Sequence, residues 1–319
     1  MKKLYKYYSS NFPLEKYLNS PTIRLSQLNA LNDPFEGFIT QDVLNELANK
    51  FHSTLSSNKE ITRSEIRESK QHIRRLINSV GITSLSETSR NLLMWSHYAS
   101  EHKGFCVGYK LPLLPPHKSK MIEPSEFKKV NYDSQLFDHE HIHLLNRKDI
   151  DTDEIFSQIA ERILTTKSQE WTYEKEYRYI TYIEQCDTIR YIKSRASIPK
   201  YIESAIRKAV DEGSHNIVEE EQHIDLVSKR TRRQLRQALH DPDSVEMNMK
   251  QSKDTMFLKE ISINDIDSIY FGAKTPIREV SRISDEIMDN KQFKDINIFH
   301  YELSKDRYEL VPYDLRLID

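Results

Sequence analysis

Two glutamates separated by one residue are the feature of this sequence best suited to chemistry. Glu174 and Glu176 lie within the aromatic and β-branched run 171–180, which predicts a strand. Side chains alternate between the two faces of a strand, so both carboxylates are expected on one face, with Arg178 beside them. Such a pair can stabilise a developing positive charge and orient a nucleophile. The alternative is an exposed edge strand whose charges discourage aggregation.

Three further clusters combine aromatic, basic and hydroxyl side chains. They cover residues 4–9, 23–37 and 84–105. Together they supply the remaining candidate site residues, which are Lys6, Tyr7, Arg24, Ser84, Ser86, Trp95 and His97.

Each of these candidates also has a structural explanation. Trp95 lies on an apolar helical pattern and would belong to the core. His97 on the same pattern would form a local ion pair with Glu101. Lys6 would be a solvated strand residue. Asp33 and Glu36 have the spacing of a helix capping box, which needs no function.

The composition excludes several classes of protein. The chain has 319 residues and a net charge of −2, which predicts no strong attraction to nucleic acid or membranes. It has six glycines and neither G-x-G-x-x-G nor a P-loop motif, which argues against Rossmann and P-loop chemistry. Cys106 and Cys186 cannot form a disulfide framework, and no spacing predicts a metal site. With no signal-peptide pattern and no long apolar run, we expect a cytoplasmic protein.

The order of elements predicts an α+β fold with a mostly antiparallel sheet, and we expect the strands near residues 4, 22, 84, 105 and 176 in one sheet system around a cleft. Expected strands cover residues 4–8, 22–26, 82–86, 105–109, 127–132, 171–180, 188–192, 257–261, 266–271, 296–301 and 308–311. Helices are expected within 13–18, 35–80, 91–102, 155–164 and 276–288. We expect a single domain over 1–319 with a charged helical insertion at about 200–255, for which the runs of Glu and Arg provide the evidence.

Several motifs, in this order, resemble the large bacterial domain-of-unknown-function family numbered 2971. They are LYKY, LNDPFEG, SLSE, LLMWSHYA, HKGFCVGY, WTYEKEYR and IYFG, and they extend from Leu4 to Gly272. This family supplies no function by itself.

The same motifs have a more distant similarity to ADP-ribosyltransferases. Transferases of the arginine type carry a basic residue on the first strand, a Ser-x-Ser strand and a late E-x-E strand. Lys6 (or Arg24), Ser84-Leu85-Ser86 and Glu174-Lys175-Glu176 follow that order. The sequence departs from the pattern in having Lys6 in place of Arg or His, and in having Ser-Leu-Ser. The resemblance implies an ADP-ribosyltransferase-like sheet with helical insertions, and NAD as the substrate.

The resemblance also implies roles for the candidates. Glu176 would stabilise the charge that develops when the nicotinamide–ribose bond breaks, and Glu174 would orient the acceptor. Lys6 and Arg24 would bind the pyrophosphate, and Ser84 and Ser86 would support the glutamates. Tyr7 or Trp95 would stack on nicotinamide, and His97 lies in the same cluster. No metal is expected. The acceptor would be a protein or a nucleic acid, in a setting such as phage defence or a toxin, and plain NAD hydrolysis is a related possibility.

Two other functions remain open. A nucleic-acid-binding protein or nuclease is suggested by the basic run 229–236, in which Lys229, Arg232, Arg233 and Arg236 would share one helix flank. A non-catalytic sensor of a nucleotide or protein is suggested by Lys6 in place of the usual Arg or His. In either case, residues 200–255 are a candidate contact surface for a partner.

Overall fold

The largest element of the protein is an eight-stranded, mostly antiparallel sheet. The computed structural model describes residues 2–55, 62–114, 127–137, 139–147, 149–194, 197–231, 234, 241 and 243–317. The strand order is β15 (Leu310–Asp314), β14 (Asn297–Leu303), β13 (Ile266–Phe271), β4 (Phe105–Lys110), β1 (Lys3–Tyr8), β3 (Val80–Ser86), β8 (Glu176–Tyr182) and β5 (Lys128–Lys129). Within this sheet β13 and β14 are parallel, and the other neighbours are antiparallel. The predicted α+β class with a mostly antiparallel sheet is confirmed.

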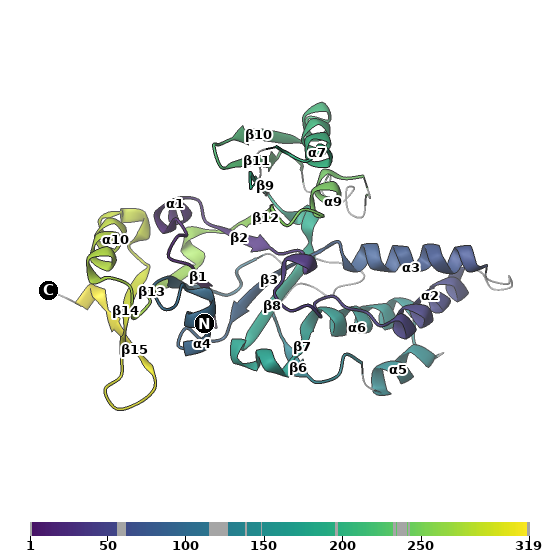
Figure 1. Cartoon of the computed structure of the whole chain (residues 1–319), viewed down its shortest axis with the longest axis horizontal. Coiled ribbons are helices and arrows are strands. Elements are labelled where there is room, and N and C mark those ends of the chain that lie inside the picture. Colours follow the sequence, from purple (N-terminus) through teal and green to yellow (C-terminus); the bar gives the residue numbers. More distant parts are fainter. Residues whose placement is uncertain are drawn as a thin grey trace.

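A second, five-stranded antiparallel sheet lies beside the first (Figure 1). Its order is β10 (His215–Glu219), β11 (His223–Ser228), β9 (Thr188–Ile192), β12 (Thr255–Glu260) and β2 (Thr22–Leu25). The sequence led us to expect the strand at residue 22 in the main sheet. It pairs instead with β12, while a bridge between Ser26 and Ile82 and a 2.8 Å hydrogen bond from the Thr83 hydroxyl to the Arg24 carbonyl join it to β3. A short parallel pair, β6 (Asn131–Asp133) and β7 (Thr166–Ser168), completes the strands.

The helices gather in three places. At one end of the molecule α2 (Gln41–Leu55), α3 (Arg63–Ile77), α5 (His139–Asn146) and α6 (Thr152–Thr165) lie together (Figure 1). Near the other end are α1 (Leu14–Asn19) and α10 (Ile277–Asp289), while α7 (Lys200–Asp211) and α9 (Val245–Met249) lie against the second sheet. The short α4 (Leu92–Tyr98) lies near β1.

Pro13, Pro199 and Pro276 each precede a helix, because proline has a φ suited to the first turn. Among the described residues no helix is long and apolar enough to cross a bilayer.

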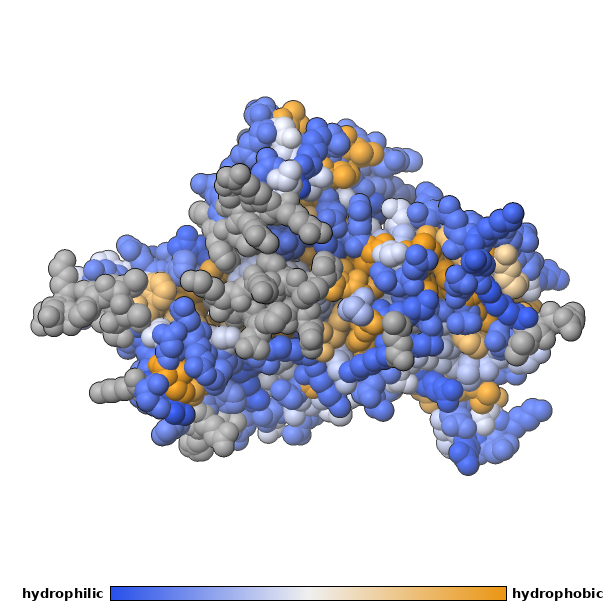
Figure 2. Space-filling view, turned by 180° about the vertical axis from the view of Figure 1, so that it is seen from behind, coloured by the Kyte–Doolittle hydropathy of each residue, from blue (hydrophilic) through white to orange (hydrophobic). Residues whose placement is uncertain are grey.

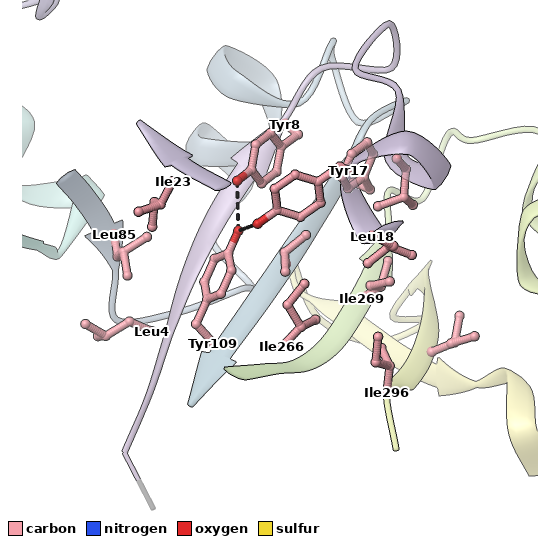
Figure 3. Packing of buried hydrophobic residues seen from close by; sticks show 14 of the residues in the cluster. Leu4, Tyr8, Tyr17, Leu18, Ile23, Leu85, Tyr109, Ile266, Ile269 and Ile296 are labelled. Atoms are coloured by element: carbon pink, nitrogen blue, oxygen red, sulfur yellow. Dashed lines mark hydrogen bonds between the residues drawn. The ribbon is translucent and has the colours of Figure 1, made fainter. Parts of the chain in front are cut away.

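A tyrosine cluster organises the core under the first strand. Leu4 and Tyr8 lie on the same face of β1 and pack with apolar residues of β4, β13 and α1. The hydroxyl of Tyr109 forms hydrogen bonds of 2.8 Å with Tyr8 and 2.7 Å with Tyr17 (Figure 3). Because buried hydroxyl groups must be paired, these bonds fix α1 against β1 and β4.

Residues 200–255 are not the helical insertion that we expected. They form α7, the hairpin β10–β11 and the short α9, and the hairpin extends the second sheet. Ile202, Leu226 and Met249 are fully buried, so apolar side chains anchor this segment. Lys229 follows β11 and is not helical, so the predicted basic helix flank is wrong at this residue. Arg232, Arg233 and Arg236 lie outside the described residues, so the rest of the flank stays a prediction.

The surface is mostly hydrophilic, as expected from a chain with 30% charged residues. Figure 2 shows scattered hydrophobic patches, one of them on the projecting β14–β15 hairpin. Leu303 and Tyr308 of this hairpin are largely exposed.

Candidate functional site

A cavity of about 230 Å³ lies where β1 and β3 meet. These strands pair at a single position, Tyr5 opposite Ser86, whereas β3 pairs with β8 along its whole length. The cavity is also lined by residues of segment 26–36, α4 and β7. Six of the predicted site residues line it, namely Lys6, Tyr7, Ser84, Ser86, Glu174 and Glu176.

The backbone that positions the two glutamates at the cavity differs from the predicted strand. Glu176 is the first residue of β8, opposite Ser86, but Glu174 ends the 3-10 helix η2 (Gln169–Glu174). Lys175 between them has a left-handed backbone with φ of 45°. The expectation of one strand over 171–180 is therefore wrong at its start. The turn at Lys175, and not strand alternation, brings both carboxylates to the cavity. The Ser86 hydroxyl donates a hydrogen bond of 2.7 Å to the Glu174 carbonyl and holds this turn.

Three buried carboxylates share two buried cations beside the cavity. Arg178 Nε donates to Glu176 Oε1 at 2.8 Å, and Arg178 Nη1 donates to Glu36 Oε2 at 2.8 Å. Lys167 Nζ lies 2.7 Å from Glu174 Oε2, 3.5 Å from Glu176 Oε2 and 3.7 Å from Glu36 Oε1. All five side chains are at most 6% exposed, so their charges interact with little screening by water.

The network keeps Glu176 ionised. Burial favours its neutral form, but the charges of Arg178 and Lys167 outweigh burial and lower its pKa to about 2. Burial raises the pKa of Glu36 above its usual range, although Arg178 opposes this shift. Burial would lower the pKa of Lys167, but Glu176 and Glu174 raise it overall. The site therefore holds a fixed negative charge at Glu176, which is the property needed beside a developing cation.

The cavity is also lined by a basic residue, Lys6. Lys6 Nζ donates to the Ser84 carbonyl at 3.3 Å, and burial together with the nearby charge of Arg24 lowers the pKa of Lys6 to about 8. Arg24 does not line the cavity, and its buried Nε has no hydrogen-bond partner among the described residues. Ser84 Oγ lies beside Glu176 and contributes to its low pKa, yet it makes no hydrogen bond of normal geometry in the described part of the chain. These groups retain donors for a ligand.

Tyr98 holds Glu174 in place from α4. Its hydroxyl donates to Glu174 Oε1 at 2.5 Å and accepts a hydrogen bond from the amide of Asn32. Burial and the neighbouring Glu174 raise the pKa of Tyr98 above its usual range, so it remains a donor at neutral pH.

Trp95 and His97 do not line the cavity, whereas Tyr7 does. Trp95 is fully buried, donates from Nε1 to the Ser89 carbonyl at 2.7 Å, and packs edge-to-face on Tyr7. It is a core residue, which was the structural alternative for it. Tyr7 borders the cavity, but its hydroxyl is tied to the Thr88 carbonyl at 2.8 Å.

His97 is exposed outside the cavity. Its Nδ1 lies 3.1 Å from the Tyr173 hydroxyl, and α4 ends at Tyr98, so Glu101 does not continue the helix toward His97. The expected local ion pair of His97 with Glu101 is therefore replaced by a contact with Tyr173.

Sequence reasoning missed the roles of four residues, which are Asn32, Glu36, Tyr98 and Lys167. Glu36 was assigned to a capping box, but residues 34–37 form a turn and its carboxylate faces Arg178. The motifs LNDPFEG and LLMWSHYA contain Asn32, Glu36 and Tyr98, so these motifs could have indicated the three residues as part of the site. Nothing in the sequence around Lys167 indicated its position. In the described part of the chain no group of three His, Cys, Asp or Glu residues could hold a metal ion.

Comparisons with known proteins agree with one of the two resemblances. No curated protein and no solved structure matched this chain. The segment 94–179, which contributes Tyr98, Lys167, Glu174 and Glu176 to the cavity, matches the model of a family described as "Protein of unknown function (DUF2971)".

Proposed function

We propose that this protein cleaves the bond between nicotinamide and ribose in NAD and transfers the ADP-ribosyl group to a macromolecular acceptor. The observation that carries the proposal is the buried Glu176 carboxylate, which Arg178 and Lys167 hold at a cavity that Lys6 also lines. A fixed anion lowers the free energy of a transition state in which ribose C1′ becomes positive.

The reaction requires one bond to break and one to form. The C1′–N bond breaks, and its electron pair leaves with the nicotinamide ring, which becomes neutral. A nucleophilic atom of the acceptor forms the new bond to C1′ and releases its proton to water. Glu174, held by Tyr98 and Lys167, orients the acceptor in this scheme. With water as the nucleophile the same steps are NAD hydrolysis.

The shape of the site supports binding of one end of the dinucleotide. Ligand pockets commonly measure about 300–1,000 Å³, so a cavity of about 230 Å³ suits the nicotinamide-ribose end rather than the whole molecule. Lys6 lines the cavity and Arg24 lies near Lys6, so both are candidates to bind the pyrophosphate. Cationic side chains with spare donors suit a pyrophosphate.

A sensor without catalysis is the second candidate. Its support is that both oxygens of Glu176 already accept hydrogen bonds from Arg178, so the carboxylate is engaged in a structural ion pair. Such a protein would bind the nucleotide and leave it intact.

Release of nicotinamide from labelled NAD tests the proposal. Purified protein should release it alone or with cell lysate, and Glu176→Gln should reduce the rate by about 100-fold or more. Glu170→Gln, at an exposed residue of the 3-10 helix η2 that carries Glu174, is the control and should keep the rate. Glu174→Gln should impair transfer of label to lysate protein or nucleic acid more than it impairs hydrolysis.

Each other result has a clear meaning. NAD binding without cleavage would favour the sensor. The absence of both binding and cleavage would overturn the NAD proposal, and retained turnover in a folded Glu176→Gln variant would remove Glu176 from the catalytic role.

A further inference from the structure

A second and larger cavity, of about 810 Å³, lies on the far side of β7 from the first. It is bounded by the turn 34–38, the start of α2, the loop after β6 and parts of α5 and α6. Its volume is in the range of pockets that bind small organic ligands. None of the predicted site residues lines it.

Aromatic rings form one part of its lining. Phe35 and Phe38 are 56% and 48% exposed, and their rings meet edge-to-face with centroids 6.2 Å apart. Phe137 lines the same cavity from the loop after β6. Large exposed apolar side chains that gather at a cavity, rather than singly, are typical of a binding surface.

The charges of this cavity are unbalanced. Asp42 and Glu46 lie one turn apart on α2, both are exposed, and neither has an ion pair with a described residue. Like charges at this spacing slightly destabilise a helix. Among the described residues that line this cavity, the only cation besides Lys167 is Arg162, which already donates to Asp133 Oδ2 at 2.7 Å, to the Leu136 carbonyl at 3.0 Å and to the Gln135 carbonyl at 2.7 Å. Free negative charge therefore faces the cavity, and its positive charge is already neutralised.

We propose that this cavity binds a small organic cation that has an aromatic or aliphatic body. The apolar body would pack between Phe35, Phe38 and Phe137, while Asp42 and Glu46 would attract the ammonium or guanidinium group. Aromatic faces add to the attraction, because their electron-rich surface favours a cation. The same charges disfavour anionic ligands of the same shape. This inference does not depend on NAD chemistry.

The position of the cavity gives a ligand there a direct mechanical link to the first site. Phe35 and Phe38 flank Glu36 in the chain, and the Glu36 carboxylate is bound to Arg178. Lys167 borders both cavities. A ligand that moves the turn 34–38 would therefore move one wall of the glutamate network.

Calorimetric titration with three compounds of one shape tests this inference. The probes are 4-phenylbutylamine, the neutral 4-phenylbutanol and the anionic 4-phenylbutyrate. We expect the amine to bind about 10-fold tighter than the anion, which corresponds to the strength of one cation–π contact combined with partly exposed charges. The double variant Asp42→Asn with Glu46→Gln should remove this preference. Asp285→Asn with Asp289→Asn, an exposed acidic pair at the same spacing on α10, should keep it.

A second variant separates the apolar contribution. Phe35→Ala with Phe38→Ala should weaken all three probes, since it removes the aromatic lining but leaves the charges. The inference is overturned if the amine binds no tighter than the anion, if no probe binds, or if the preference survives in the Asp42 and Glu46 double variant. NAD turnover is not a readout in this experiment, so its outcome is separate from that of the proposed reaction.

Discussion

Arg178 and Glu36, which are 142 positions apart in the chain, form a two-pronged ion pair beside the first cavity. Nη1 and Nη2 of Arg178 donate to the two carboxylate oxygens of Glu36 at 2.8 and 2.5 Å, and the same guanidinium also binds Glu176. One buried cation thus fixes the turn 34–37 to the strand that carries Glu176. The arrangement shifts the pKa values of the two carboxylates in opposite directions, since the pKa of Glu176 is lowered and the pKa of Glu36 is raised.

The raised pKa of Glu36 predicts a specific dependence of stability on pH. The folded protein holds the Glu36 proton to a higher pH than the unfolded chain, whose value is near 4.5. Stability should therefore fall as the pH rises from about 4.5 through the folded pKa. Glu36→Gln cannot titrate and should lack this part of the decline. Urea unfolding of both proteins at several pH values measures the difference, and a constant difference between them would contradict the prediction.

Lys167→Met should destabilise the fold strongly. It leaves three buried carboxylates with Arg178 as their nearest buried cation, and removal of one partner from a buried ion pair costs about 3–5 kcal/mol. Without Lys167, the pKa of Glu176 should rise, so any NAD cleavage should gain an acidic limb and recover at higher pH. Thermal unfolding and a pH–rate profile measure both effects. Lys103→Met, at an exposed lysine, is the control and should change neither.

The affinity for a ligand that contacts Lys6 should fall as the pH rises. Lys6 is charged below a pKa of about 8, so its attraction for a pyrophosphate weakens as the pH rises through that value. Between pH 7 and pH 9 the affinity for ADP-ribose should drop by up to roughly 10-fold, in proportion to the loss of protonated lysine. Lys6→Arg should remove the dependence, because the guanidinium stays charged. Calorimetry with ADP-ribose provides the measurement, and an identical pH dependence in Lys6→Arg would exclude Lys6 as its source.

The segment 200–255 should contribute to stability as part of the fold. Leu226 is fully buried in the core of the second sheet, so Leu226→Ala should reduce the free energy of unfolding by about 2–5 kcal/mol. Val218→Ala, on the same hairpin but 46% exposed, should change it by less than about 1 kcal/mol. Equal unfolding free energies for the two variants would show that this hairpin is a dispensable surface insertion.

Local patterns predicted much of the fold. Alternation and breakers located β1, β3, β4, β9 and β13 to within about two residues, and prolines marked the starts of α1 and α10. The partner of a strand is not a local property. The TIRL strand therefore gave no sign that it pairs with β12, more than 200 positions later, and not with the main sheet.

The sequence predicted most of the residues that form the site, but it did not predict their geometry. Six of the nine candidates line one cavity, because β1, β3 and β8 are neighbours in the main sheet. The left-handed turn at Lys175 could not be foreseen, since a lysine rarely adopts a positive φ. The position of Lys167 was also hidden, because only long-range packing brings its ammonium group to the three glutamates.

The first cavity has a consequence for how the protein is made. Its walls come from four separate stretches of the chain, 5–7, 26–36, 84–98 and 167–176. A chain still on the ribosome has no such cavity until residue 176 has emerged, which is more than half of the 319 residues. Translation therefore delays the assembly of the site, and a truncated product that ends before β8 would lack both the glutamate wall and whatever reaction depends on it.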